Sequence, residues 1–216
     1  MKRKALYLIL AITAPFSFVF GQTESIKIFL FPKDNFIPIK KEEIKVINNT
    51  YYSKLYNFSI GIPQVVKTVP SSGLPNNCIF EINNEYSNFG FWISQYSKMY
   101  YTKEYSKKIM KFSKAFKELY SKKLFEEPAF KGSTIIDDNI NTLDISGIPS
   151  FQYKCHFIKR TPDKEYNGQI IITQLFYKKF NYRIVCTYDY TSPKKDVVLY
   201  LNDFLVSSFK ILNTND

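Results

Sequence analysis

The chain of 216 residues contains 20 Phe and 17 Tyr but only 7 Gly, a composition that supports a buried core and excludes an intrinsically disordered protein. Its formal net charge is +11, yet only three of its 30 basic residues are arginine. Because specific contacts to bases and phosphates depend largely on the arginine fork, we do not expect nucleic acid as a partner.

The N-terminus has the layout of a secretory signal peptide. Lys2, Arg3 and Lys4 precede an uncharged, mostly apolar run over residues 5–20, and the expected cleavage position follows Gly21. The run is short for a membrane span and a proline interrupts it, so cleavage is favoured over an uncleaved anchor. We therefore expect an exported protein, periplasmic or secreted, with no membrane span after cleavage.

The chain divides into three expected parts: a signal peptide over 1–21, an N-terminal extension over 22–50 and a single α+β domain over 51–212. The extension is polar and mixed, with a strand-like stretch over residues 26–31, and it could also serve as an edge element.

Three strands are predicted early in the domain. Phe58 and Ile60 alternate with small residues up to Pro63, which indicates a half-buried strand with a defined end. Residues 78–82 and 89–96 are the next two strands, separated by an Asn-rich turn.

The clearest helix is predicted over residues 103–123. Its apolar residues fall within about 100° of arc, which makes one face suitable for burial, and Thr102 is suited to cap its start. The opposite face carries a stripe of lysines, namely Lys103, Lys107, Lys111 and Lys114.

A β meander and a final helix follow. The meander strands are predicted over 151–157, 169–177 and 182–188. Lys178 and Lys179 connect the last two as an antiparallel hairpin, and Ser192 with Pro193 is expected to open the final helix. This order predicts an α+β fold, an antiparallel sheet of about six or seven strands covered by two main α-helices.

Three motifs in this order resemble the PsbP-like superfamily. Tyr56–Pro63 (YNFSIGIP) resembles its opening strand, Ser146–Ser150 (SGIPS) the entry to its central meander, and Ser207–Lys210 (SSFK) its closing Ser-Phe. The resemblance covers about residues 51–211. It implies a PsbP-like fold in a family whose members include an extrinsic photosystem subunit, a nuclear-transport cofactor and exported bacterial proteins, and which mostly act by docking to partners. The signal peptide fits the exported bacterial branch, and no functional residue is carried over.

No catalytic or metal-binding constellation stands out among the His and Cys residues. His156 is the only histidine and neighbours Cys155 on a predicted strand, so their side chains point to opposite faces. With Cys78 and Cys186 there are three cysteines, which together with one histidine do not make a zinc site. No cofactor is expected. Buried thiols and one disulfide among the three, with its pairing undetermined, are equal alternatives.

The acidic residues give no stronger signal. The run Asp137–Asn141 starts like a calcium loop, but Thr142 and Ile148 occupy the positions of the glycine and the glutamate, so a surface turn is expected. Trp92 is expected in the core, with an exposed ligand platform as the alternative. Adjacent carboxylates do not make the pair across a cleft that a glycosidase needs; such pairs are Glu42/Glu43, Glu126/Glu127 and Asp137/Asp138.

These observations predict an exported, non-enzymatic accessory protein that docks to a protein partner in the cell envelope or outside the cell. The first alternative is a binding module for anionic lipid or polysaccharide, which would use the lysine stripe of the 103–123 helix. The simpler interpretation of that stripe is the solvated back of an amphipathic helix. A hydrolase is the third hypothesis.

Overall fold

The computed structural model describes residues 37–64, 66–69, 74, 77–95, 117–118, 121–122, 125–126 and 130–212. These residues form two antiparallel β-sheets and one α-helix with defined ends, so the fold is α+β with β-structure dominant. No helix in this described part of the chain is long and apolar enough to cross a membrane.

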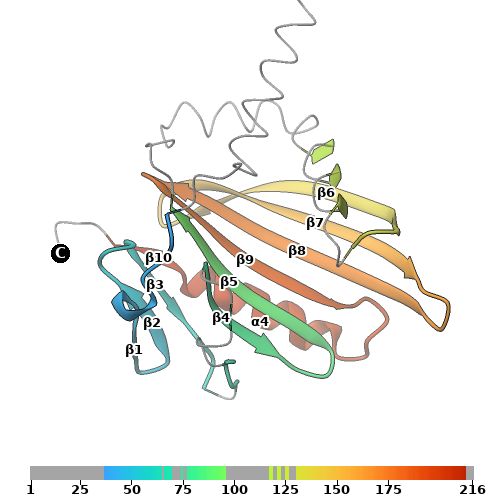
Figure 1. Cartoon of the computed structure of the whole chain (residues 1–216), viewed down its shortest axis with the longest axis horizontal. Helices are drawn as coiled ribbons and strands as arrows, with labels where there is room; N and C mark the ends of the chain where they lie inside the picture. Colours follow the sequence, from blue (N-terminus) through green and yellow to red (C-terminus); the bar gives the residue numbers. More distant parts are fainter. Residues whose placement is uncertain are drawn as a thin grey trace, which may run out of the picture.

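The larger sheet has six strands in the order β4-β5-β9-β8-β7-β6, and all neighbours are antiparallel (Figure 1). Its strands are β4 (Cys78–Asn83), β5 (Ser87–Gln95), β6 (Ser133–Ile145), β7 (Ile148–Arg160), β8 (Glu165–Tyr177) and β9 (Phe180–Asp189). β6 and β7 are joined by a two-residue turn in which Ser146 and Gly147 have φ angles of 55° and 75°. Positive φ at both positions defines the type I′ turn that matches the twist of a hairpin.

The smaller sheet joins early and late parts of the chain. It has the order β1-β2-β3-β10 and contains β1 (Lys45–Ile47), β2 (Thr50–Ser53), β3 (Phe58–Gly61) and β10 (Lys210–Ile211). A 3-10 helix, η1 (Lys41–Glu43), precedes it. The end of the predicted N-terminal extension therefore contributes the edge strand β1.

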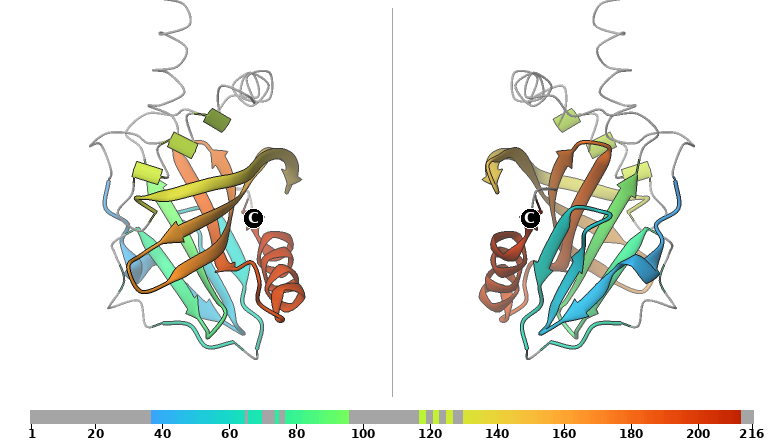
Figure 2. Two further views of the ribbon diagram at one scale, coloured as in Figure 1. Left: turned by 90° about the vertical axis from the view of Figure 1, so that its right-hand side faces the viewer. Right: turned by 90° about the vertical axis from the view of Figure 1, so that its left-hand side faces the viewer.

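One α-helix, α4 (Lys195–Ser208), lies against one side of the larger sheet (Figure 2). It buries Val198, Asn202 and Leu205. The helix begins at Lys195, beyond the predicted start at Ser192. The Ser192 hydroxyl accepts the backbone N–H of residue 194 at 3.2 Å, so this serine closes the turn before the helix.

Alternation along the strands gives the larger sheet two buried faces. On the helix face, residues such as Phe91 and Tyr182 pack against the smaller sheet and α4. On the far face, Tyr153 belongs to a second apolar cluster that includes Phe125 and Phe130. The large aromatic content of the sequence is thus divided between two cores that share one sheet.

Aromatic residues hold the two sheets together on the helix face. The ring centroids of Phe58 and Phe91 lie 5.1 Å apart, and the ring of Phe209 stacks parallel to that of Phe58 at 6.4 Å. The buried Tyr182 hydroxyl donates a hydrogen bond of 2.6 Å to the backbone carbonyl of Tyr56. These contacts connect β9, β5 and β3 around one core.

Most predicted strands are confirmed, but the expectation of two main helices is not borne out. Among the described residues α4 is the one α-helix with defined ends, and the predicted 103–123 helix lies mostly outside them, with helical backbone at 117–118 and 121–122. The predicted six or seven strands are too few. The structure has a second, smaller sheet in addition to the larger one. β6 is also not predicted as a strand, because its Asp and Asn residues favour turns.

Candidate functional site

The β7–β8 hairpin projects beyond its neighbour β9 in the larger sheet. Pairing between β7 and β8 continues outward to Arg160 opposite Glu165, whereas β9 ends at Asp189 opposite Gly168. The end of the hairpin therefore stands clear of its neighbour β9 and leaves the far face open beside it.

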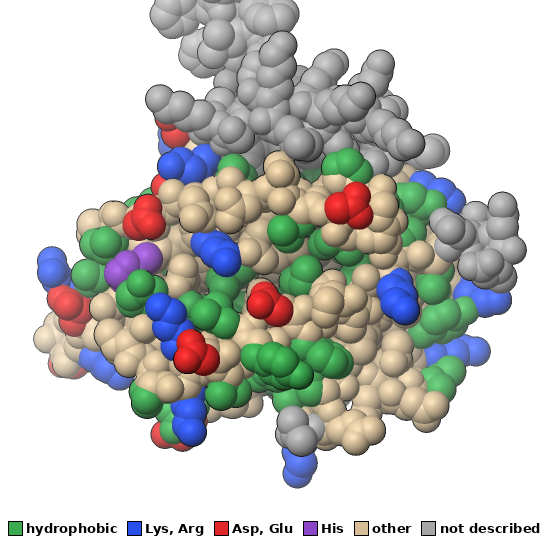
Figure 3. Space-filling view, turned by 180° about the vertical axis from the view of Figure 1, so that it is seen from behind, with side chains coloured by type: hydrophobic (Ala, Val, Ile, Leu, Met, Phe, Trp, Pro, Cys, Tyr) green, Lys and Arg blue, Asp and Glu red, His purple; other side chains and the backbone are tan. Residues whose placement is uncertain are grey.

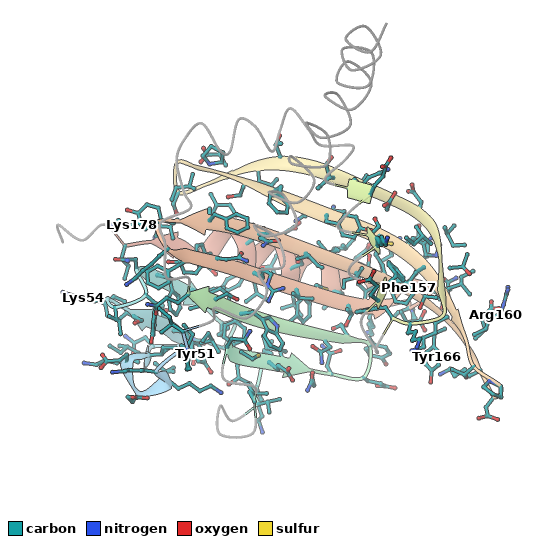
Figure 4. All side chains as sticks on the ribbon, turned by 45° about the horizontal axis from the view of Figure 1, so that its top comes forward. Tyr51, Lys54, Phe157, Arg160, Tyr166 and Lys178 are labelled. Carbon is teal, nitrogen blue, oxygen red and sulfur yellow. The ribbon has the colours of Figure 1, made fainter. Side chains whose placement is uncertain are left out.

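A groove of about 660 Å³ lies at the base of this projection, and we call it the hairpin groove. It crosses four strands of the far face, with Asn88 from β5, Thr187 from β9, Gly168 from β8 and Phe157 from β7 among its lining residues. Figure 4 shows Phe157 and Tyr166 at this end of the sheet.

An aromatic cluster forms the floor of the hairpin groove. A Cβ atom built on Gly168 would lie 2.5 Å from Cζ of Phe157, so the absence of a side chain allows the phenyl ring to lie across β8. The rings of Phe125 and Phe130 meet Phe157 edge-on, with centroids 5.8 Å and 5.4 Å away. Such edge-to-face contacts fix the floor in one arrangement.

The hairpin side of the groove carries a partly exposed aromatic ring. Tyr166 is 48% exposed, and the ammonium of Lys164 lies 4.8 Å from its ring centroid. At the tip, Arg160 Nε and Glu165 Oε2 form an exposed ion pair of 2.7 Å. The ring of Tyr166 thus offers apolar surface next to groups that hydrogen-bond.

The opposite wall is polar and held by local hydrogen bonds. Asp189 accepts hydrogen bonds from the backbone N–H and the hydroxyl of Thr191, at 2.9 Å and 2.6 Å. These bonds lower the pKa of the Asp189 carboxyl, which therefore stays ionised. Among the described lining residues there is no histidine or cysteine, so the groove holds no imidazole base next to a nucleophile.

His156 lies on the helix face, outside the hairpin groove. Its ring stacks on Tyr190 with centroids 4.1 Å apart, and Nε2 is 2.5 Å from Oδ1 of Asn167. The ammonium of Lys195 lies 3.9 Å from the centroid of Tyr190, on the first turn of α4. The histidine is therefore engaged in a stack that ties α4 to the sheet.

The three cysteines are free and buried. Register places Cys155 beside Ile170 and Cys186 beside Ile171, and consecutive residues on a strand point to opposite faces. Cys155 and Cys186 thus cannot bridge within this sheet. Burial raises the pKa of the Cys78 thiol to about 12 and that of Cys155 to about 11, so neither is a reactive thiolate near neutral pH.

A polar network on the far face attaches the segment around residue 121 to the sheet. Ser121 Oγ is 2.7 Å from both Asp138 Oδ2 and the Tyr153 hydroxyl, and Lys117 Nζ is 2.9 Å from Asp138 Oδ1. Burial disfavours the Asp138 carboxylate, but the hydrogen bonds from Ser121, Lys117 and Tyr153 outweigh it and hold the pKa of Asp138 below its usual value. The network holds two segments together.

The remaining predicted sites are not brought together. The calcium-like run Asp137–Asn141 lies inside β6, so the expected surface turn is wrong: pairing with β7 keeps the run extended. Among the described residues, no group of three His, Cys, Asp or Glu could hold a metal ion. Trp92 is half-buried on the far face, opposite Arg183 in register, and belongs to neither described core cluster. The candidate anionic-ligand residues lie outside the described residues, namely Lys103, Lys107, Lys111 and Lys114.

No protein-family model and no curated protein matches the sequence. Among solved structures, the chain is similar to cyanobacterial PsbP (CyanoP) from Synechocystis sp. PCC 6803. The TM-score is 0.51 at 13% identity, over 83% of this chain and 99% of that chain. The chain has a PsbP-like fold.

Two further structures are less similar to this PsbP-like chain. One is LpqN, involved in cell envelope biogenesis of Mycobacterium tuberculosis, with a TM-score of 0.46 and 8% identity over 72% of this chain and 83% of that chain. The other is the Ran-binding protein Mog1p of Saccharomyces cerevisiae, with a TM-score of 0.44 and 10% identity over 79% of this chain and 98% of that chain.

The motifs that resemble the PsbP-like superfamily have structural roles here. Ser208 Oγ accepts the backbone N–H of Gly61 at 3.2 Å and so joins the end of α4 to β3. A Cβ atom built on Gly61 would lie only 3.3 Å from Cβ of Ser208, so β3 and the end of α4 approach each other closely at this point. In the PsbP-like fold of this chain, these motif residues attach the smaller sheet to the helix and do not line the hairpin groove.

Sequence reasoning missed the hairpin groove. The pattern of residues 151–157 identifies Phe157 as an inward residue but does not show what it packs against. One available signal is Gly168, since a glycine inside a strand pattern often marks a close approach. The projection of the hairpin depends on where β9 ends, which only the tertiary pairing defines.

Proposed function

We propose that this PsbP-like chain is an exported, non-enzymatic accessory protein that docks a protein partner at the hairpin groove. The observation that carries the proposal is the exposed ring of Tyr166 on a projecting hairpin, above a fixed aromatic floor. Aromatic anchors beside well-packed pockets dominate the energetics of protein interfaces.

Apolar surface continues from the groove onto β6. Ile135 is the partner of Phe157 in register and is 37% exposed. A register shift follows it, and Ile136 at this irregularity is 52% exposed. Together with Tyr166 these side chains give the end of the sheet an apolar centre surrounded by polar and charged groups, which is the usual anatomy of an interface.

The charge distribution favours a protein over a uniformly charged surface as the partner. On the side of the molecule that carries α4, basic and acidic side chains are interspersed (Figure 3). The hairpin groove itself combines Lys159 and Lys164 with Glu165 and Asp189. Mixed charge of this kind fixes orientation and specificity more than it attracts a polyanion.

Crosslinking followed by affinity capture of the mature protein from its own cell envelope, at low and high salt, tests the proposal. The critical variant is Tyr166→Ala, and Tyr200→Ala is the control because Tyr200 is 68% exposed on α4, away from the groove. We expect one stoichiometric protein partner that survives high salt, is lost with Tyr166→Ala and is retained with Tyr200→Ala. Recovery of only lipid or glycan, lost at high salt, would contradict the proposal.

A further inference from the structure

β6 is an outer strand of the larger sheet, and within the described part of the chain only its edge toward β7 is paired with a strand. It pairs with β7 from Ser133 to Ile145, and no strand among the described residues lies along its other edge. The outer edge of this 13-residue strand is a template for an added strand.

The turn between β6 and β7 determines which backbone groups point outward. The two-residue type I′ turn leaves Ile145 and Ile148 as its flanking pair, whose N–H and C=O groups bond to each other across the hairpin. Alternation along the strand then turns the backbone groups of every second residue away from β7. These residues are Asp138, Ile140, Thr142 and Asp144.

The outward edge of β6 already binds one cation of this chain. Lys117 Nζ donates to the backbone carbonyl of Asp138 at 3.3 Å and lies 2.9 Å from its Oδ1. This contact agrees with the outward direction assigned to Asp138. β6 carries three aspartates and no lysine or arginine, whereas the chain as a whole carries a net charge of +11. Edge strands are commonly protected by lysine, and β6 itself contains none.

The charges of β6 disfavour one symmetric register of pairing with a second copy. A symmetric antiparallel pair centred on Asn141 would place Asp138 opposite Asp144 of the second copy, twice in each dimer. Like charges directly opposite each other on neighbouring strands destabilise the pair. A strand with a basic residue at that position would instead gain a cross-strand ion pair.

We propose that the outer edge of β6 accepts an extended segment of a partner protein as an antiparallel seventh strand, with a lysine or arginine opposite Asp144. Asp144 is exposed, and its Oδ1 accepts the backbone N–H of Gly147 at 2.8 Å, which orients the carboxylate at the start of the edge. This surface is separate from the hairpin groove, so it holds whether or not the groove binds the first partner.

The test uses the mature protein and a fluorescent ten-residue peptide of alternating lysine and valine, with a glutamate–valine peptide for comparison. Thr142→Pro removes an outward N–H without removing a bond to β7, since proline lacks only the donor that points to solvent. Thr142→Val keeps that N–H and is the matched control. Asp144→Lys inverts the charge of the side chain that, in the proposal, selects a basic residue on the added strand.

We expect the lysine peptide to bind about tenfold more tightly than the glutamate peptide, because charge-assisted pairing replaces repulsion. Thr142→Val should retain this binding, Thr142→Pro should lose it, and Asp144→Lys should reverse the preference. Hydrogen exchange of the unmodified protein should slow at residues 140, 142 and 144 when the lysine peptide is present, a readout that needs no variant.

Three results would overturn the proposal. One is equal binding of the lysine peptide by a folded Thr142→Pro variant. Another is amide protection confined to residues outside β6. The third is a dimer in sedimentation experiments that Thr142→Pro abolishes, which would assign the edge to a second copy of the chain.

Discussion

The ring of Phe157 occupies the space into which a side chain on Gly168 would project, with 2.5 Å between Cζ and the position of a Cβ atom. Gly168→Ala should therefore displace the phenyl ring and loosen the floor of the hairpin groove. We expect a loss of about 1–3 kcal/mol in the free energy of unfolding, measured by urea denaturation, because the floor is closely packed.

A double-mutant cycle with Phe157→Leu separates this contact from a general effect of the alanine. The smaller leucine should accept the new methyl group, so the double variant should be more stable than the sum of the single losses indicates. Strict additivity of the two losses would contradict the assigned contact.

Tyr182→Phe should cost about 1–3 kcal/mol of the free energy of unfolding, because the carbonyl of Tyr56 would lose a hydrogen bond in a buried place. The bond measures 2.6 Å and joins the two sheets. Tyr166→Phe is the matched control: its side chain is 48% exposed, so the same chemical change should leave urea midpoints nearly unaltered. Equal midpoints for the two variants would argue against the inter-sheet bond.

The Asp138 network gives stability that depends on pH. Its hydrogen bonds hold the pKa of Asp138 below the unfolded value of about 3.9, so its contribution is complete above that pH and is lost as pH falls through the lower folded pKa. Asp138→Asn should lower the free energy of unfolding by about 1 kcal/mol at pH 7, with a gap to the unmodified protein that narrows below about pH 4.

Asp137→Asn is the control for that experiment, because Asp137 is exposed and lies on the other face of β6. Its urea midpoint should follow that of the unmodified protein at each pH. A gap between Asp138→Asn and the unmodified protein that stays constant from pH 7 to pH 3 would refute the proposed role of the ionised carboxylate.

The three thiols should resist alkylation in the folded protein. Burial raises the pKa of Cys78, Cys155 and Cys186, which removes both access and thiolate. With iodoacetamide at pH 8, mass spectrometry should find no adduct on the native protein and three adducts after unfolding in urea. Labelling of native protein at any of the three, or a mass two units low before reduction, would contradict this arrangement.

The sequence predicts strands well where one face is apolar and the other is not. The alternation of Phe58 and Ile60 and the pattern of residues 182–188 correspond to β3 and β9. It fails at β6, where Asp137 and Asp138 resemble a turn and only the pairing with β7 keeps the chain extended. The PsbP-like fold is predicted from short motifs. Two of these motifs contain Gly61 and Ser208, whose hydrogen bond joins β3 to α4.

The hairpin groove could not be predicted from local sequence patterns, because residues from four different strands meet there. The position of Asp189 opposite Gly168 decides how far the hairpin projects, and no local pattern encodes that register. His156 illustrates the reverse case: the expectation that it points away from Cys155 holds, while its stack on Tyr190 depends on where α4 begins.

The union of β3 with β10 has a consequence for biosynthesis. Gly61 and Ser208, which hold this junction together, are 147 positions apart, so β3 leaves the ribosome long before its second neighbour exists. The smaller sheet cannot close during translation, and contacts between distant segments of this kind form slowly. In a nascent chain, β3 therefore keeps one edge without its partner strand through most of the synthesis of the protein.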